Sequence, residues 1–98
     1  MLFEERAMNL AELVDVVAYQ SGQTKTVSRE VIKTTLDVIL KEVKQGGRVS
    51  VVGFGAFYQA LRQPRTGRNP QTGETVEIAA AKVPRFRAGK DFKEQVKK

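Results

Sequence analysis

Residues 62–75 read RQPRTGRNPQTGET and contain no hydrophobic residue, although they lie inside a chain of only 98 residues. The segment is longer than most connections in a compact domain. It is also unlike a flexible Gly/Ser linker, because Arg62, Arg65 and Arg68 recur every three residues and residues 69–73 are typical of a turn. We therefore predict a protruding arm at about residues 62–75 that folds over a polyanion.

The sequence on both sides of this arm predicts β-structure. Residues 49–52 and 56–61 are typical of two strands joined by a glycine turn at residues 53–55. Residues 76–78 predict a returning strand that continues toward Val83, and Pro84 to Arg87 are expected to end it. A short helix is then expected from Gly89. The arm thus interrupts a small antiparallel sheet of three strands.

Two helices are predicted before the sheet. The first covers residues 10–18, where apolar residues form one stripe, with Asn9 as its N-cap and Gly22 beyond its end. The second begins at Thr24 or Ser28 and ends at Gly46. Its apolar face is wider than one small neighbour can cover, which indicates that two chains share the core. The predicted fold class is therefore α+β, in a single domain.

The basic charge of the chain is concentrated in its second half. The formal net charge is +6, from 17 Lys and Arg against 11 Asp and Glu. Residues 1–45 carry a net charge of −1, whereas residues 46–98 carry +7. A nearly neutral scaffold followed by a cationic surface indicates a polyanionic partner rather than an adjustment of solubility alone.

The residue types that most enzymes and metal sites need are missing from the sequence. It has no Cys and no His, which excludes disulfides, thiolate or imidazole zinc sites and imidazole-dependent triads. The acids are scattered singly, and the turn at residues 53–55 lacks the Gly-Lys-Ser/Thr of a phosphate loop. No apolar run is long enough to span a membrane. We expect a cytoplasmic, non-enzymatic binding protein without cofactor, metal or small-molecule substrate.

Nucleic acid is the partner that suits these residues best. The arginines of the arm offer planar, permanently charged groups for phosphates or a narrow minor groove, and Lys90 and Lys93 add further charge. Pro70 has two interpretations. The sequence alone favours a turn residue with a fixed φ, and the alternative is an apolar wedge that unstacks a base step.

Three stretches together resemble the HU/integration host factor family of bacterial histone-like DNA-bending proteins. They are GFGAF at residues 53–57, RTGRNPQTG at residues 65–73 and AAAKVPRFRAGK at residues 79–90. The resemblance covers about residues 8–98 and implies an intertwined dimer, with a helical base, a saddle of strands and two β-ribbon arms around the DNA. It also implies minor-groove binding, with Pro70 as the intercalating residue. The DNA-binding residues predicted in this way are Arg62, Arg65, Arg68, Asn69 and Pro70 in the arm, and Lys25, Arg87, Lys90 and Lys93 in the body.

Departures from the family pattern bear on specificity. Family members often have a basic residue where Leu10 and Ala60 stand, and the site-specific branch has an arginine where Val52 stands. These differences favour HU-like binding of low sequence specificity to double-stranded DNA, especially bent, kinked or gapped DNA, by a homodimer in the nucleoid. The alternatives are a site-specific host-factor subunit (a heterodimer included) and a basic module that binds RNA or protein. Residues 1–7 are predicted to be a flexible extension.

Overall fold

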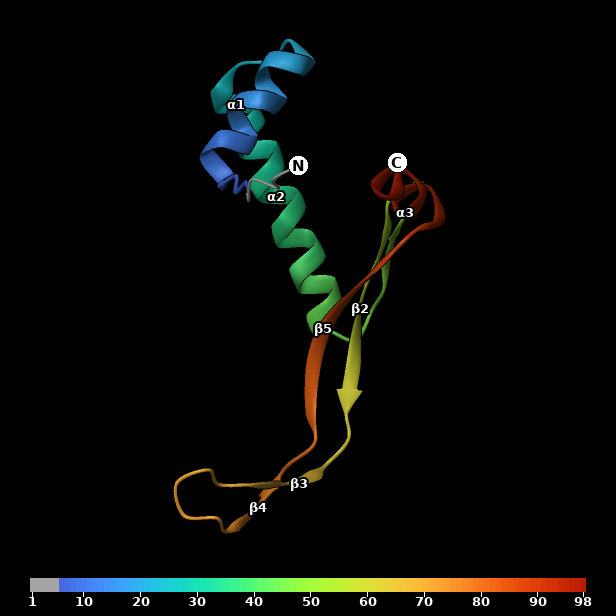
Figure 1. The fold of residues 1–98 in the computed structure, drawn as a ribbon. Coiled ribbons are helices and arrows are strands. Elements are labelled where there is room, and N and C mark those ends of the chain that lie inside the picture. The colour runs from blue at the N-terminus through green and yellow to red at the C-terminus, as the bar shows by residue number, and fades with distance from the viewer. Residues whose placement is uncertain (1–5) are drawn as a thin grey trace. The chain divides into compact units, whose positions relative to one another are not determined.

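The computed structural model describes residues 6–98, and its helices and strands follow the predicted order (Figure 1). The elements are α1 (Leu10–Ser21), α2 (Lys25–Lys44), β1 (Val49–Val51), β2 (Gly55–Arg62), β3 (Arg65–Arg68), β4 (Thr75–Ile78), β5 (Ala81–Ala88) and α3 (Lys90–Lys97). The predicted α+β class is confirmed. The chain divides into two units, Met1–Val38 and Ile39–Lys98. Of the extension predicted at residues 1–7, residues 1–5 lie outside the described part, and Arg6 and Ala7 have no secondary structure.

The first unit is built on the helix signals that the sequence carries. The Asn9 side chain accepts a hydrogen bond from the Glu12 N–H at 2.8 Å, and the left-handed Gly22 donates its N–H to the Ala18 carbonyl. Val14 and Ala18 on the inner face of α1 are buried. At the start of α2, the hydroxyl of Thr24 accepts from the Val27 N–H at 3.1 Å. The N-cap of α2 is therefore Thr24 rather than Ser28.

Thr24 and Ser28 offer a test of this assignment by opposite effects on stability. Thr24→Ala removes the cap and is expected to lower the free energy of unfolding by about 1 kcal/mol. Ser28 is buried, and its hydroxyl finds no hydrogen-bond partner among residues 6–98. Ser28→Ala is therefore expected to leave the free energy of unfolding unchanged or to raise it by up to about 1 kcal/mol. Chemical denaturation measures the free energy of unfolding of each variant. A larger destabilisation by Ser28→Ala than by Thr24→Ala would show that Ser28, and not Thr24, is the N-cap.

The second unit is organised around an antiparallel three-stranded sheet in the order β1-β2-β5. Val49 pairs with Phe57, which pairs with Phe86, and the next row joins Ser50, Ala56 and Arg87. Directly paired residues lie on the same face of a sheet, and neighbouring rows alternate. The sheet is therefore two-sided: one face carries Val49, Phe57 and Phe86, with Gln59 and Lys82 farther along toward the arm, and arginines stand on the other face.

The first of these faces carries a cluster of phenylalanines. The rings of Phe57 and Phe86 lie 4.8 Å apart, and the ring of Phe92 on α3 meets that of Phe54 edge to face at 5.1 Å. Gly55 is required here, since a Cβ at this position would lie 2.6 Å from the Phe86 ring. The cluster anchors α3 to the sheet, and a hydrogen bond of 2.9 Å from the Gly89 N–H to the Phe54 carbonyl fixes the start of this helix.

The prediction that Pro84 to Arg87 end the returning strand is wrong. β5 continues through these residues to Ala88, and all of them pair with β2. The physical reason is that β5 is an edge strand. Proline is tolerated on an edge strand because an N–H that points away from the sheet has no partner strand, so its loss at Pro84 breaks no hydrogen bond of the sheet. The extension places Arg85 and Arg87, two residues apart, on one face of the sheet.

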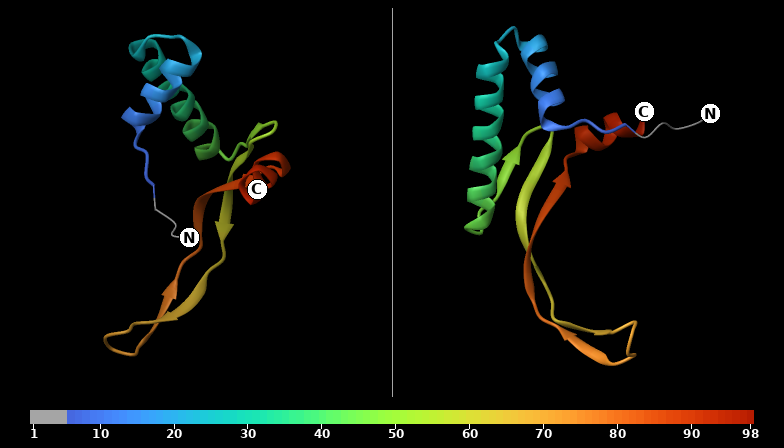
Figure 2. Two further views of the ribbon diagram at one scale, coloured as in Figure 1. Left: turned by 45° about the horizontal axis from the view of Figure 1, so that its top comes forward. Right: turned by 90° about the vertical axis from the view of Figure 1, so that its left-hand side faces the viewer.

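The arm is a β-ribbon in which β3 pairs with β4 from Arg65↔Ile78 to Arg68↔Thr75. Figure 2 shows β2 and β5 side by side and leading into this ribbon. The tip is closed by Asn69, whose N–H donates to the Glu74 carbonyl at 2.8 Å and whose carbonyl accepts from the Gly73 N–H at 2.7 Å. Gly73 has a φ of +74°, a conformation that glycine adopts without strain.

Large apolar side chains remain exposed on α2. Val31, Leu36, Val38 and Leu40 are 58 %, 51 %, 58 % and 64 % exposed, and the fully buried side chains of the described residues are few and small. The hydrophobic effect disfavours such a surface on an isolated chain. Among residues 6–98 no helix has the length and apolar character that crossing a bilayer requires.

Candidate nucleic-acid interface

The second face of the sheet in the second unit is basic. Arg62 pairs with Ala81, Tyr58 with Arg85, and Ala56 with Arg87, so three arginines project on the same side. Arg48, just before β1, joins them, because its guanidinium lies 5.3 Å from the centre of the Tyr58 ring. The residues of this side, which we call the arginine face, are Arg48, Ser50, Ala56, Tyr58, Ala60, Arg62, Ala81, Val83, Arg85 and Arg87. None of them is acidic.

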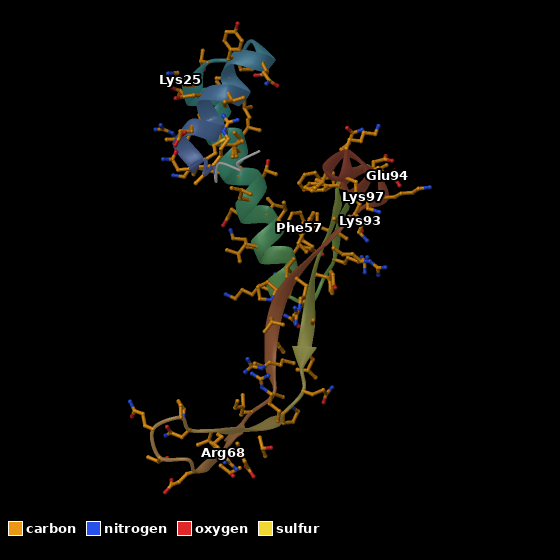
Figure 3. The ribbon with its side chains drawn as sticks, viewed as in Figure 1. Lys25, Phe57, Arg68, Lys93, Glu94 and Lys97 are labelled. Atoms are coloured by element: carbon orange, nitrogen blue, oxygen red, sulfur yellow. The ribbon has the colours of Figure 1, made fainter. Side chains whose placement is uncertain are left out.

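Lysines of α3 extend this basic surface at one end of the sheet. Lys90, Lys93 and Lys97 line a cavity of about 520 Å³ together with Arg48 and Arg87. Figure 3 shows Lys93, Glu94 and Lys97 on α3. Glu94 also lines this cavity and is an acid on an otherwise basic wall. The structure thus brings together three of the predicted body residues, namely Arg87, Lys90 and Lys93.

The arm presents its arginines on both faces of the ribbon. Arg65 shares a face with Val76 and Ile78, because alternate residues of paired strands project on the same side. Arg68, which Figure 3 shows on the ribbon, lies on the opposite face with Glu77. On a helix, a spacing of three residues would place Arg65 and Arg68 close together. On this ribbon the same spacing places them on opposite faces. The ribbon thus carries an arginine on each of its two faces.

Asn69 and Pro70 occupy the tip of the arm. The Asn69 side-chain oxygen accepts from the Gln71 N–H at 2.9 Å, so the residue holds its own turn in the free chain. Pro70 is exposed. Its role as a wedge stays a prediction, and so does the DNA-binding role of the other predicted residues.

Lys25 lies apart from these residues in sequence and belongs to the first unit. It is the first residue of α2, and its ammonium group forms an ion pair with the Asp15 carboxylate at 3.3 Å. Both side chains are largely exposed, so the pair contributes little to stability. Lys25 can bind another anion only when its ion pair with Asp15 breaks.

The DNA-binding residues predicted from the sequence do not include Arg48, Arg85 and Lys97, which the structure places on the same basic surface. Lys97 follows Lys93 by four residues on α3, a signal that was present in the sequence. Arg85 was not predicted as a surface residue of the sheet because the strand was expected to end at residues 84–87. Arg48 is placed by the register between β1 and β2, which no local pattern specifies.

Comparison with known proteins decides the family. The family model of the bacterial DNA-binding protein matches residues 8–97. The chain belongs to this family. It is 46 % identical over 90 residues to DNA-binding protein HU-alpha of Escherichia coli, an alignment that covers 92 % of this chain and 100 % of the relative. It is 47 % identical over 90 residues to DNA-binding protein HU-1 of Halalkalibacterium halodurans, with the same coverage.

Members of this family with solved structures share the fold. The chain of the Anabaena HU–DNA cocrystal structure has a TM-score of 0.87 and 46 % sequence identity, over 91 % of this chain and 97 % of that one. HU from Thermotoga maritima has a TM-score of 0.65 and 31 % identity, over 91 % and 98 % of the two chains. The resemblance to the HU/integration host factor family that the motifs indicate is therefore confirmed.

Proposed function

We propose that the chain is an architectural protein that binds, bends and compacts double-stranded DNA with low sequence specificity. The observation that carries the proposal is the arginine face, where Arg48, Arg62, Arg85 and Arg87 stand without an acidic neighbour on that face. Contacts from such residues to phosphates supply affinity without reading sequence. The relative from Anabaena was crystallised with DNA, which supports the same partner here. We expect such a protein in the bacterial nucleoid, in the cytoplasm, and we expect no catalysis.

The working form that we propose is a homodimer. Val31 and Val38 on one side of α2 and Leu36 and Leu40 on another are more than half exposed. A second copy of the chain that packs on both sides would bury them in a shared core. In the dimer the net charge of residues 46–98 is doubled, and two arms face one duplex.

Low sequence specificity is tested by competition between two duplexes of unrelated sequence and equal length. Val52, at the turn between β1 and β2, is fully exposed and its side chain offers no hydrogen-bond donor to a base edge. We expect the two affinities to agree within tenfold, which corresponds to about 1.4 kcal/mol. A larger preference would support a site-specific subunit instead, and equal affinity for duplex RNA would support a general basic module.

Pro70 is proposed to act as a wedge between base pairs. Its ring is an exposed apolar group at the tip of a polar arm, and apolar side chains inserted into the minor groove unstack and kink DNA. Pro70→Ala is expected to reduce the bend, measured by energy transfer between dyes on the two DNA ends, while changing the affinity only a few-fold.

Pro64→Ala is the matched control for this variant. Pro64 is also exposed and belongs to the same arm, but it precedes β3 and lies away from the tip. We expect wild-type energy transfer from Pro64→Ala. An unchanged bend with Pro70→Ala, at saturating protein, would rule out the wedge.

A further inference from the structure

The cavity beside α3 has room for a ligand much smaller than DNA. Its volume is about 520 Å³, and its walls come from the residue before β1, the β1–β2 segment, the end of β5 and α3, all within the second unit. The small residues Ala56, Ala88 and Gly89 take up little of the space. Pockets that hold small organic molecules measure about 300–1,000 Å³, so the cavity is large enough for one. The double helix is too wide to enter it and reaches only the rim.

The cavity gathers positive charge from three segments of the chain. The cationic residues that line it are Arg48, Arg87, Lys90, Lys93 and Lys97. None of these side chains forms an ion pair with a carboxylate of residues 6–98. Like charges gathered around one cavity repel each other, and an anion that carries several charges relieves this repulsion. A short chain of linked phosphates is a compact anion of that kind, and arginine binds phosphate oxygens with paired hydrogen bonds.

Glu94 is the only acid among the described residues that line the cavity. A carboxylate in this place repels phosphates, so DNA binding does not account for it. It is, however, an acceptor for hydrogen bonds from hydroxyl groups. An acidic residue binds the ribose hydroxyls in this way in dinucleotide-binding folds. Glu94 therefore indicates a ligand that carries neutral hydrogen-bond donors beside its phosphates.

Val51 and Val52 give the wall an apolar part. Val51 is 44 % exposed and Val52 is fully exposed, so neither side chain is buried in the core of the described residues. Both are therefore free to cover the flat apolar surface of a heterocyclic base. The cations, the carboxylate and the valines together correspond to the phosphates, the sugar and the base of a nucleotide.

We propose that this cavity is a binding site for a nucleoside polyphosphate. Arg48, Arg87 and the lysines of α3 bind the phosphate chain, Glu94 accepts hydrogen bonds from the ribose hydroxyls, and Val51 and Val52 pack against the base. The ligand is bound and not converted, in keeping with the expected absence of catalysis. The proposal goes beyond the proposed function and does not rest on DNA binding.

The first test compares two probes, adenosine triphosphate (ATP) and inorganic tripolyphosphate, by isothermal titration calorimetry of the wild-type protein without divalent cations. Tripolyphosphate carries at least as much negative charge as ATP but has neither ribose nor base. We expect ATP to bind more tightly by about tenfold, which is the contribution of a hydrogen bond to a charged group. Equal or tighter binding of tripolyphosphate would show a general polyanion surface and overturn the nucleotide site.

Glu94→Gln tests the part of the site that recognises the sugar. Loss of the carboxylate weakens the hydrogen bonds from the ribose hydroxyls and reduces the repulsion of phosphates for both probes alike. The preference for ATP over tripolyphosphate is therefore expected to fall by about tenfold. Glu30→Gln makes the same change on α2 and is expected to keep the wild-type preference. A preference that Glu94→Gln leaves unchanged would overturn the proposal.

The double variant Lys93→Gln, Lys97→Gln tests the part of the site that binds phosphates. Both side chains are exposed, so the fold is expected to be retained, and circular dichroism checks this. We expect ATP to bind at least about tenfold more weakly. Arg29→Gln, Lys33→Gln removes the same charge from α2 and is expected to keep the ATP affinity within about twofold. An equal loss in the two double variants would overturn the site, because net charge then accounts for the effect.

The arm separates this proposal from DNA binding. Arg65→Ala, Arg68→Ala changes residues outside the cavity and is expected to bind ATP as the wild type does, although its duplex binding falls. Loss of ATP binding in this variant would overturn the assignment of the ligand to the cavity. A wild type that binds the duplex but not ATP overturns the nucleotide site and leaves the proposed function intact. A wild type that binds ATP but no duplex supports the site and overturns the proposed function.

Discussion

Replacing Arg65 and Arg68 together with alanine is expected to weaken duplex binding by roughly 10³-fold at about 0.15 M salt. This variant removes four guanidinium groups from a dimer, and the slope of log affinity against log salt falls by about 0.9 for each phosphate that they neutralise. The effect is large because the charge disappears from both faces of the ribbon, Arg65 on the side of Val76 and Arg68 on the side of Glu77. Binding titrations at several salt concentrations measure both the affinity and the slope.

The charge-conserving variant Arg65→Lys, Arg68→Lys is the control for this prediction. It keeps the number of cations in the arm, so the slope is expected to stay close to that of the wild type. The affinity falls somewhat because an ammonium group cannot make the paired hydrogen bonds of a guanidinium. If the alanine variant also keeps the wild-type slope, the arm does not touch the phosphates.

The second large effect is expected from Leu36→Glu, which places a carboxylate on the apolar surface of α2. Full burial of a leucine side chain contributes about 1.5–3 kcal/mol, and a symmetric dimer contains the position twice. The change therefore raises the dimer dissociation constant by at least about 100-fold. Because the exposed apolar surface then has no partner, we also expect lower thermal stability.

Thr26→Glu is the matched control for the dimer variant, since it adds the same charge to an exposed position of α2. Sedimentation equilibrium at micromolar concentration is expected to show dimers for the wild type and Thr26→Glu and monomers for Leu36→Glu. A monomeric wild type, or a Leu36→Glu variant that stays dimeric, would contradict the proposed assembly.

Local signals in the sequence were sufficient to predict that the helices form and that an arm is present. Asn9 and Gly22 bound α1 as their cap chemistry predicts. The ribbon covers Arg65–Ile78, so it begins inside the segment without hydrophobic residues but extends past it to Val76 and Ile78, which were expected in the returning strand of the sheet. These features depend on neighbours within a few residues, so the pattern along the chain contains them. The same holds for the lysines of α3, whose spacing places them along one wall of a cavity.

What the sequence could not provide depends on strand register. Whether Pro84 ends a strand depends on whether that strand lies at an edge, which is a property of the whole sheet. Arg48 and Arg85 are far apart in the chain. The pairing of β1, β2 and β5 places them on the two sides of Tyr58. The arginine face is thus a product of the register, and composition revealed only its net charge.

The most direct test of DNA binding by the basic half of the chain is the salt dependence of wild-type binding to a short duplex of arbitrary sequence. With Arg65 and Arg68 of two arms in contact with phosphates, the slope of log affinity against log salt is expected to be about −4 or steeper. It is expected to be the same for a second, unrelated duplex. A slope near zero, or no binding at low salt, would contradict DNA binding through the arms.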